Sequence, residues 1–288
     1  EYVLALSILD PAGNVPAGKL AVLKSAIPYI DRVTNLSRAE GGRDQESLEE
    51  AKFRARREMR AQQRAVTAED FESLSKNASR SIARAKCRAP RTPGGTQPPG
   101  TVDLFVVPAA AEALRAGDLR KLALEPKLIQ EIDKYLEPYR LLTTNLLIHE
   151  PRYVGVQVVA EIVPVEYARP EVVSARVAER LRRFICPVVM EGEAEQDSSF
   201  LGPDWEGWPF GKALFVSELY SLVQNVPGVK HVRQVQLSQR PVSPGKESSE
   251  REAGAPLPAL TPADGRLIEI PPDALFCSLD HEIKLVEL

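Results

Sequence analysis

The alternation of polar and hydrophobic positions is most informative around Thr67, in the stretch RAVTAEDFESLS. The Thr67 hydroxyl can accept a hydrogen bond from the backbone N–H of Asp70, and the Asp70 carboxylate can accept one in return, which is the pattern of a capping box. A helix over residues 68–79 is therefore predicted, with Val66 packed against Phe71 as a hydrophobic staple. Its apolar residues recur at three- and four-residue steps and form a face that needs cover: Phe71, Leu74, Ala78 and Ile82.

A second helix is predicted in the charged segment just before it, over residues 47–64. Acidic residues come first in this segment and basic residues last, which suits the helix dipole at both ends. Ser47 and Glu50 can form another capping box. The apolar stripe of this helix is thin and consists of Leu48, Ala51, Ala55 and Met59. Because so narrow a stripe buries little, we expect the helix to be a strut between domains or to be covered by a partner chain.

From residue 101 the pattern changes to apolar strands that alternate with amphipathic helices. The predicted order is strand, helix, strand, strand, helix, strand, which is typical of a split β-α-β (ferredoxin-like) unit and of the α+β class. A turn at residues 150–152 would join the second and third strands. The predicted segments are TVDLFVV, PKLIQEIDKYLEPY, RLLTTNLLIH, YVGVQVVAEIV, PEVVSARVAERLRRFI and GVKHVRQVQL. An extra helix, LFVSELYSLVQ, precedes the last strand, with Leu219, Leu222 and Val223 as its inner face. Four-residue steps define the apolar face of the helix PEVVSARVAERLRRFI: Val173, Val177, Leu181 and Ile185. Alternation defines one face of the strand YVGVQVVAEIV: Val154, Val156, Val158, Ala160 and Ile162.

Turn-rich and charged stretches divide the chain into six predicted parts. They are a partial N-terminal α/β segment (1–40), a helical arm with a connecting strand (41–88), a linker (89–100), a ferredoxin-like α+β domain with an inserted loop and helix (101–240), an exposed or disordered insertion (241–265) and a set of C-terminal strands (266–288). A strand is predicted over residues 2–8. Because the sequence opens at this strand and without Met, we expect a fragment or a processed chain.

Composition and charge favour an ordinary globular protein. Hydrophobic residues make up 43% of the chain and charged residues 27%, and the formal net charge is -3. The local basic runs are interleaved with acids and lack alternating aromatic residues, so no nucleic-acid partner is expected. No apolar run approaches the roughly 20 residues of a membrane-spanning helix, and no membrane contact is predicted.

Residues with catalytic or metal-binding chemistry are scattered. Three widely spaced cysteines without a CxxC pair are expected to be reduced and buried. Three isolated histidines lack metal-ligand spacing and are expected to be ordinary strand or turn residues. These residues are Cys87, Cys186, Cys277, His149, His231 and His281. Since the chain has no GxSxG, GxGxxG or complete phosphate loop, we expect no enzymatic activity, metal or cofactor; the competing hypothesis is an enzyme whose site is built from dispersed acids and histidines.

An aromatic cluster in the segment DWEGWPFG allows two interpretations. Trp205, Trp208 and Phe210 could form a platform for a sugar ring. The surrounding Pro and Gly residues favour a structured loop that plugs into the sheet or into a neighbouring subunit.

Short motifs spread over most of the chain follow one another in a specific order. Residues 41–47 read GGRDQES, residues 64–71 read RAVTAEDF and residues 99–102 read PGTV. Further motifs are Leu142-Thr143-Thr144 with Pro151 and Tyr153, Gly207-Trp208-Pro209-Phe210-Gly211, Ser217-Glu218-Leu219-Tyr220 and Pro227-Gly228-Val229. In order and spacing they resemble the J-like baseplate wedge proteins (putative baseplate assembly proteins) of contractile phage tails and contractile injection systems.

This resemblance implies a non-enzymatic wedge component, made in the cytoplasm and incorporated into the baseplate of a phage virion, an extracellular injector or a membrane-anchored one. The implied partners are other wedge subunits (a second J-like protein and copies of the chain), central hub or spike proteins and sheath-proximal proteins. The two helices would form an angled arm that contacts neighbouring subunits, and a triggered rearrangement would let the sheath contract. The expected interface residues are Leu48, Ala51, Ala55, Met59, Phe71, Leu74, Trp208 and Phe210, with helix caps at Ser47, Glu50, Thr67 and Asp70. The alternative is a carbohydrate- or receptor-binding module of such a particle that uses the Trp205 and Trp208 loop.

Overall fold

The computed structural model divides the chain into two compact units, Glu1–Gln63 and Arg64–Leu288. The boundary falls inside the segment 41–88 that the sequence predicts as one arm. The described residues are 15–22, 33–36, 48, 51, 52, 55, 64–88, 100–190, 205–245, 258–263 and 266–286. In the first unit the described residues 48, 51, 52 and 55 are helical. The predicted strand at 2–8, the caps Ser47 and Glu50, and Met59 lie outside the described residues, as does most of the predicted insertion 241–265.

The second unit begins with the predicted capped helix, α2 (Ala68–Ala78). The Thr67 hydroxyl accepts from the Asp70 N–H at 3.3 Å, and the Asp70 carboxylate accepts from the Thr67 N–H at 2.8 Å, so the capping box forms. The predicted staple is not a buried contact, because Val66 remains 62% exposed. The carboxylate of Asp70 also accepts the Val66 N–H at 3.2 Å, which fixes the start of the helix by hydrogen bonding instead.

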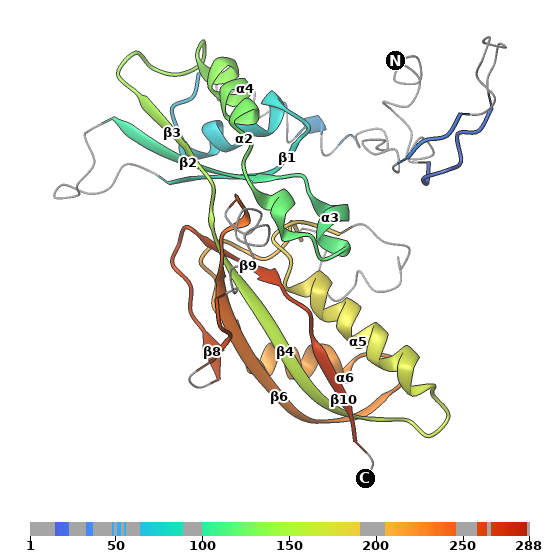
Figure 1. The fold of residues 1–288 in the computed structure, drawn as a ribbon. Coiled ribbons are helices and arrows are strands. Elements are labelled where there is room, and N and C mark those ends of the chain that lie inside the picture. The colour runs from blue at the N-terminus through green and yellow to red at the C-terminus, as the bar shows by residue number, and fades with distance from the viewer. Residues whose placement is uncertain are drawn as a thin grey trace. The chain divides into compact units, whose positions relative to one another are not determined.

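Helix α2 packs on a three-stranded sheet of order β1-β2-β3 (Figure 1). β1 and β2 are antiparallel, whereas β2 and β3 are parallel and are joined by a helical crossover. The elements are β1 (Ile82–Arg88), β2 (Thr101–Pro108), α3 (Ala111–Arg115), the 3-10 helix η2 (Leu119–Leu122), α4 (Pro126–Leu136) and β3 (Asn145–His149). Apolar residues of α2 and α4 pack against apolar residues of β1 and β2 and form one core with them: Phe71, Ile132 and Leu136 from the helices, and Ile82, Leu104 and Val106 from the strands.

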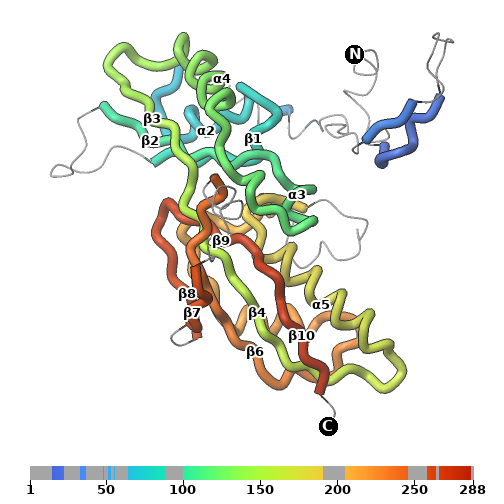
Figure 2. Tube along the Cα trace, in the orientation of Figure 1, coloured from blue at the N-terminus to red at the C-terminus, as the bar shows by residue number. Residues whose placement is uncertain are grey.

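A second, five-stranded sheet has the order β10-β4-β6-β7, with β9 also paired to β4. Its centre is a long antiparallel pair, β4 (Arg152–Pro164) and β6 (Val229–Val242), and α5 (Pro170–Phe184) and α6 (Val216–Gln224) supply apolar side chains to its core. The other strands of this sheet are β7 (Thr261–Pro262), β9 (Ala274–Ser278) and β10 (Glu282–Leu285), whereas β5 (Leu214–Phe215) and β8 (Leu267–Ile268) pair with each other in a separate two-stranded sheet. Figure 2 shows β9 and β10 following one another along the same edge of β4. The residues predicted for the inner faces of α5 and α6 are buried there: Val173, Val177, Leu181, Ile185, Leu219, Leu222 and Val223.

The α+β class is confirmed, but the strands are arranged differently from the predicted ferredoxin-like unit. The strands expected to share one sheet are divided between two, and residues 150–151 carry the chain from β3 in the first sheet to β4 in the second. The predicted hairpin is therefore wrong. The prediction failed because the alternation of polar and apolar residues identifies a strand but does not identify the strand that pairs with it. In the structure β3 pairs with β2, to which the helical crossover joins it in parallel.

Candidate assembly interface

Three residues of the predicted apolar stripe, Leu48, Ala51 and Ala55, lie at described helical positions of the first unit. Leu48 is 71% exposed, and Ala51 and Ala55 are partly exposed. Exposure of a single leucine is ordinary, but here it occurs at the first position of the predicted stripe.

Two other predicted interface residues belong to the interior of the second unit. Phe71 is 2% exposed, and Leu74 is partly buried against the same cluster. The prediction that this helix leaves its apolar face for a neighbouring subunit is wrong, because the face is already covered by the chain's own sheet and by α4. Sequence periodicity shows that a helix face needs cover but not which element supplies it.

The Trp208 side chain is fully buried and anchors the aromatic loop. Its Nε1–H donates to the Lys212 carbonyl at 3.0 Å, and its backbone N–H donates to the Cys186 carbonyl at 2.7 Å. The indole makes edge contacts with three rings whose centroids lie 5.2 to 6.3 Å away, those of Phe184, Trp205 and Phe276. The loop thus packs into the core of the chain's own second sheet, and the Trp208 side chain is not exposed for contact with another molecule.

The proposed sugar platform does not form. Trp208 is 0% exposed, and Trp205 stacks on Phe184 with its ring nearly parallel, at a centroid distance of 5.8 Å. A sugar needs an open aromatic face, so the alternative of a carbohydrate site built on both tryptophans has no accessible platform.

Arg84 joins the aromatic loop to the three-stranded sheet. From β1 its Nη1 donates to the carbonyls of Pro187 at 2.7 Å and Trp208 at 2.8 Å, and the guanidinium lies 5.2 Å from the centroid of the Phe210 ring. Burial lowers the pKa of Arg84, and the carbonyl acceptors compensate the buried charge. Phe210, predicted as an interface residue, is partly buried under this arginine. No sequence motif marked Arg84 as the residue that connects the two sheets.

Two of the histidines take part in structural contacts. His149 on β3 lies 3.2 Å from the carboxylate of Asp103, which also accepts from Arg88 at 2.9 Å. His231 is exposed on β6. Within the described ranges, no group of three or more His, Cys, Asp or Glu residues is arranged to hold a metal ion.

His281 lies where the strand beside β4 is interrupted between β9 and β10. Val156 and Val159 of β4 are three positions apart, whereas their partners Ser278 and Glu282 are four positions apart, so the second strand has one extra residue and forms a bulge. The Val158 N–H donates to His281 Nδ1 at 3.1 Å. Since Nδ1 accepts, Nε2 carries the proton and donates to Ser278 Oγ at 2.9 Å, while the Ser278 hydroxyl donates to the Leu279 carbonyl at 3.1 Å. The imidazole nitrogen thus takes the place of the backbone carbonyl that would accept the Val158 N–H from a continuous neighbouring strand.

This neutral histidine makes stability depend on pH. Burial, followed by the charge of Arg182, lowers the pKa of His281 to about 3 from an ordinary value of 6.5. Between these values the unfolded chain binds a proton that the folded chain does not, so stability is lost as the pH falls below about 6.5. At pH 5 the contribution of this group to the loss is expected to be about 2 kcal/mol.

The measurement is urea unfolding of the wild type and of His281→Asn at pH 7 and pH 5. The asparagine carbonyl still accepts the Val158 N–H but does not titrate. The variant should therefore show a smaller drop between the two pH values than the wild type, and equal drops would contradict the role given to His281.

The three cysteines are free and buried, as predicted. Burial raises the pKa of Cys186 to about 12 and that of Cys87 to about 11, so both remain thiols.

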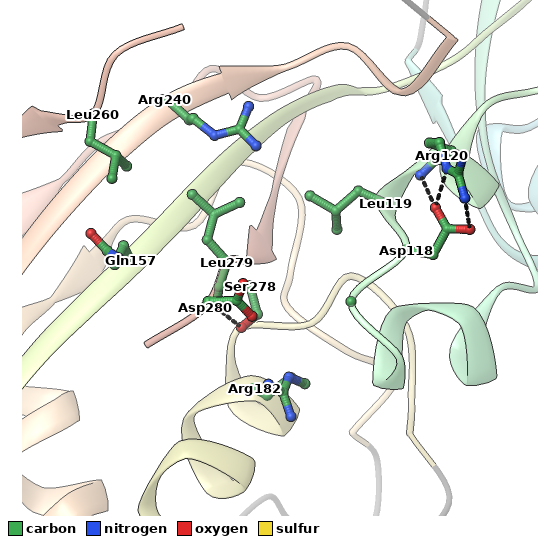
Figure 3. Close-up of a pocket in the computed structure, with 11 residues that line it drawn as sticks. Asp118, Leu119, Arg120, Gln157, Arg182, Arg240, Leu260, Ser278, Leu279 and Asp280 are labelled. Atoms are coloured by element: carbon green, nitrogen blue, oxygen red, sulfur yellow. Dashed lines mark hydrogen bonds and ion pairs between the residues drawn. The ribbon is translucent and has the colours of Figure 1, made fainter. Parts of the chain in front are cut away.

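A pocket of about 230 Å³ lies beside the bulge, and Figure 3 shows it from close by. It is built from the segment before and within η2, from β4 and β6, from α5, from the residue before β7, and from the end of β9 with the turn after it. Its lining residues are Gly117, Asp118, Leu119, Arg120, Gln157, Arg182, Arg240, Leu260, Ser278, Leu279 and Asp280. Sequence reasoning missed this site, because its residues are far apart in the chain and form no motif.

The described part of the chain is an α+β arrangement built on a three-stranded and a five-stranded sheet with a small two-stranded sheet, and a similar fold occurs in a solved structure. That structure is the "Cryo-EM structure of the anti-feeding prophage (AFP) baseplate, 6-fold symmetrised", with a TM-score of 0.54 and 17% sequence identity. The match covers 90% of this chain and 48% of that chain, so the chain spans about half the length of the chain that it matches. No protein-family model and no curated protein matches the chain.

Proposed function

We propose that the chain is a structural component of the baseplate of a contractile, tail-like particle. The observation that carries this proposal is the exposed apolar position Leu48 on a helix whose stripe is too thin to form a core of its own. The proposal is supported by the motifs that resemble J-like wedge proteins and by the likeness of the fold to a chain of a baseplate structure. Among the described helices, none has the length and apolar character needed to span a membrane.

In more detail, we propose a J-like wedge subunit whose helix before Arg64 contacts neighbouring subunits. The contact surface then comprises Leu48, Ala51, Ala55 and Met59, since Phe71, Leu74 and Trp208 lie in the interior. Partners would be a second J-like protein, further copies of the chain, hub or spike proteins and sheath-proximal proteins. The wedge would be incorporated from the cytoplasm into the baseplate of the particle and would couple its triggering to sheath contraction.

We also propose that the chain is not an enzyme. Ser278 and His281 are in hydrogen-bond contact, but the nitrogen that faces the serine carries the proton and donates it. A general base must instead accept the serine proton. The pair therefore supports a structural role at the bulge.

A Leu48→Asp variant tests the proposed interface. A carboxylate in an apolar contact costs roughly 2 kcal/mol or more, so we expect incorporation into particles to fall about tenfold or more. Thermal unfolding of the isolated chain should be unchanged, because Leu48 is exposed in it. The readout is the fraction of particles with a complete baseplate, counted by electron microscopy of the producing cells' lysate.

The control is Gln130→Asp, which adds the same charge at an exposed position of α4. It should assemble as the wild type does. Normal assembly of Leu48→Asp would contradict the proposal.

A further inference from the structure

The five-stranded sheet ends on one side at β10, which lies beside α5 on the side of β4 away from β6 (Figure 1). The Val286 N–H donates to the Ile162 carbonyl of β4 at 3.0 Å, so alternate residues of β10 face β4. Ile283 and Leu285 lie between them and direct their N–H and C=O groups outward. Within the described part of the chain these outward groups have no hydrogen-bond partner. An edge of this kind can pair with a further strand.

The opposite edge of the sheet, along β6, is closed by side chains of α6. Gln224 donates from Nε2 to the Lys230 carbonyl and accepts the Val232 N–H at Oε1, both at 3.2 Å. The Tyr220 hydroxyl accepts the Val235 N–H at 3.1 Å, and β7 pairs with β6 further along the strand. A strand can therefore be added at β10, whereas at β6 it would have to displace these side chains. With one open edge, association through this sheet stops at two copies.

The side chains of β10 complement a second copy of the same strand. Ile283 and Leu285 pair with β4 residues of the core that α5 covers, whereas Glu282 and Lys284 lie on the other face of the sheet, with Lys284 Nζ 3.6 Å from Glu282 Oε1. In an antiparallel pair centred on Ile283, each Glu282 lies opposite the Lys284 of the other copy. The two Ile283 residues then exchange their outward N–H···O=C bonds. A parallel pair in register would instead place like charges opposite each other.

The flank of α5 that turns toward this edge carries small side chains. Arg182 on this flank lines the pocket beside the bulge between β9 and β10. Ala178 and Ser174 occupy the same flank one and two turns earlier. In the antiparallel pair both α5 helices lie on the same face of the joined sheet, and small residues between them permit a close approach.

We propose that β10 is the surface through which two copies of the chain pair, in an antiparallel arrangement centred on Ile283. This inference deepens the proposed function, in which copies of the chain are among the partners, and it rests on that function only for placing the pair in a particle. Because two four-residue strands bury little surface, the dimer should be weak and dependent on concentration.

The experiment is sedimentation equilibrium of the purified full chain at low salt, over about 5 to 500 µM, a range suited to a weak dimer. Glu282→Lys and Lys284→Glu each replace two opposite-charge pairs by like-charge pairs, and each should weaken dimerisation by about tenfold. An equimolar mixture of these two variants should dimerise as the wild type does, because the opposite charges then face each other again. The chain that carries both exchanges should also dimerise normally.

A backbone variant tests the hydrogen bonds at the centre of the pair. Ile283→Pro removes the outward N–H and leaves the bonds to β4 in place, so it should abolish dimerisation. Ile283→Ala loses the same side chain but keeps the N–H, and it should still dimerise. Thermal unfolding of both variants shows whether the sheet itself is intact.

The charge control is Lys230→Glu, at an exposed position of β6 near the opposite edge, and it should dimerise as the wild type does. A chain that stays monomeric up to about 500 µM, equal weakening by Lys230→Glu, or a mixture that dimerises no better than its components would overturn the proposal. The Leu48→Asp chain should dimerise normally, so failure of this inference and failure of the proposed assembly role can be told apart. Assemblies larger than a dimer in that variant would also overturn the proposal, because they would require a second open edge.

Discussion

A Trp208→Ala chain is expected to lose about 4 kcal/mol of unfolding free energy, the largest loss among the substitutions considered. The indole is fully buried, and its removal leaves a cavity between α5, the aromatic loop and β9, where Phe184, Trp205 and Phe276 contact it. The Lys212 carbonyl also loses the donor that the indole N–H supplies at 3.0 Å. The measurement is equilibrium unfolding in urea, in which the midpoint should fall without a change in the slope of free energy against urea concentration.

Trp205→Ala is the matched control because the second indole is only partly buried and stacks on one side of Phe184. Its loss should be clearly smaller. Equal losses for the two variants would mean that Trp208 does not anchor the loop. The aromatic loop would then be a candidate binding surface again.

The features that sequence predicted correctly are those set by neighbouring residues. The capping box at Thr67 and Asp70 depends on a spacing of three residues, and it forms as expected. The inner face of α5 depends on four-residue steps, and Val173, Val177 and Leu181 are all buried. Such patterns are local, so tertiary context does not change them.

The features that sequence did not predict depend on which elements meet in space. β2 is buried along almost its whole length, and its partners are β1 on one side and β3 on the other. The alternation in β4 correctly placed Val156, Val158 and Ala160 on a buried face but could not show that β6, β9 and β10 would pair with it. A long parallel crossover separates β2 from β3, and a hairpin between β3 and β4 was the simpler expectation.

Of the predicted interface residues, Phe71 and Trp208 lie in the interior, whereas Leu48 has the same apolar character and is exposed. The role of Leu48 in an interface stays a prediction. Hydrophobicity alone does not separate an interface from a core, since both bury apolar surface. The pocket with Arg120, Arg182 and Arg240 had no sequence signal at all, because the three arginines belong to elements that are joined only by the fold.

These placements change how the proposed wedge would transmit force. The second unit holds its two sheets together through Arg84, which bonds to the backbone of Pro187 and Trp208, and through an apolar cluster shared between them. If the chain is the proposed wedge, the Arg84 contacts and the shared apolar cluster would stay intact during a rearrangement of the particle, and contacts at the surface would change. The burial of the aromatic loop suits a rigid connection, and the proposed assembly contact lies on the residues before Arg64.

Gly207→Ala is expected to cost about 3 kcal/mol of unfolding free energy, because the loop that carries Trp208 has no room for a Cβ atom at this position. Gly207 has a φ of +100°, and a Cβ there would lie 2.7 Å from the carbonyl atoms of Pro187 and 2.8 Å from the Val188 nitrogen. These are backbone atoms and cannot rotate away, and the Pro187 carbonyl is also an acceptor for Arg84.

The comparison is Gly117→Ala, at a φ of +78° with no atom within 4 Å of the added Cβ, which should cost about 1 to 2 kcal/mol from backbone conformation alone. Both variants are measured by urea unfolding, with the near-ultraviolet circular dichroism of the buried tryptophan as a second probe. A Gly207→Ala chain as stable as Gly117→Ala would show that the loop can move away from Pro187. The inference that the aromatic loop and Arg84 form a rigid connection would then be wrong.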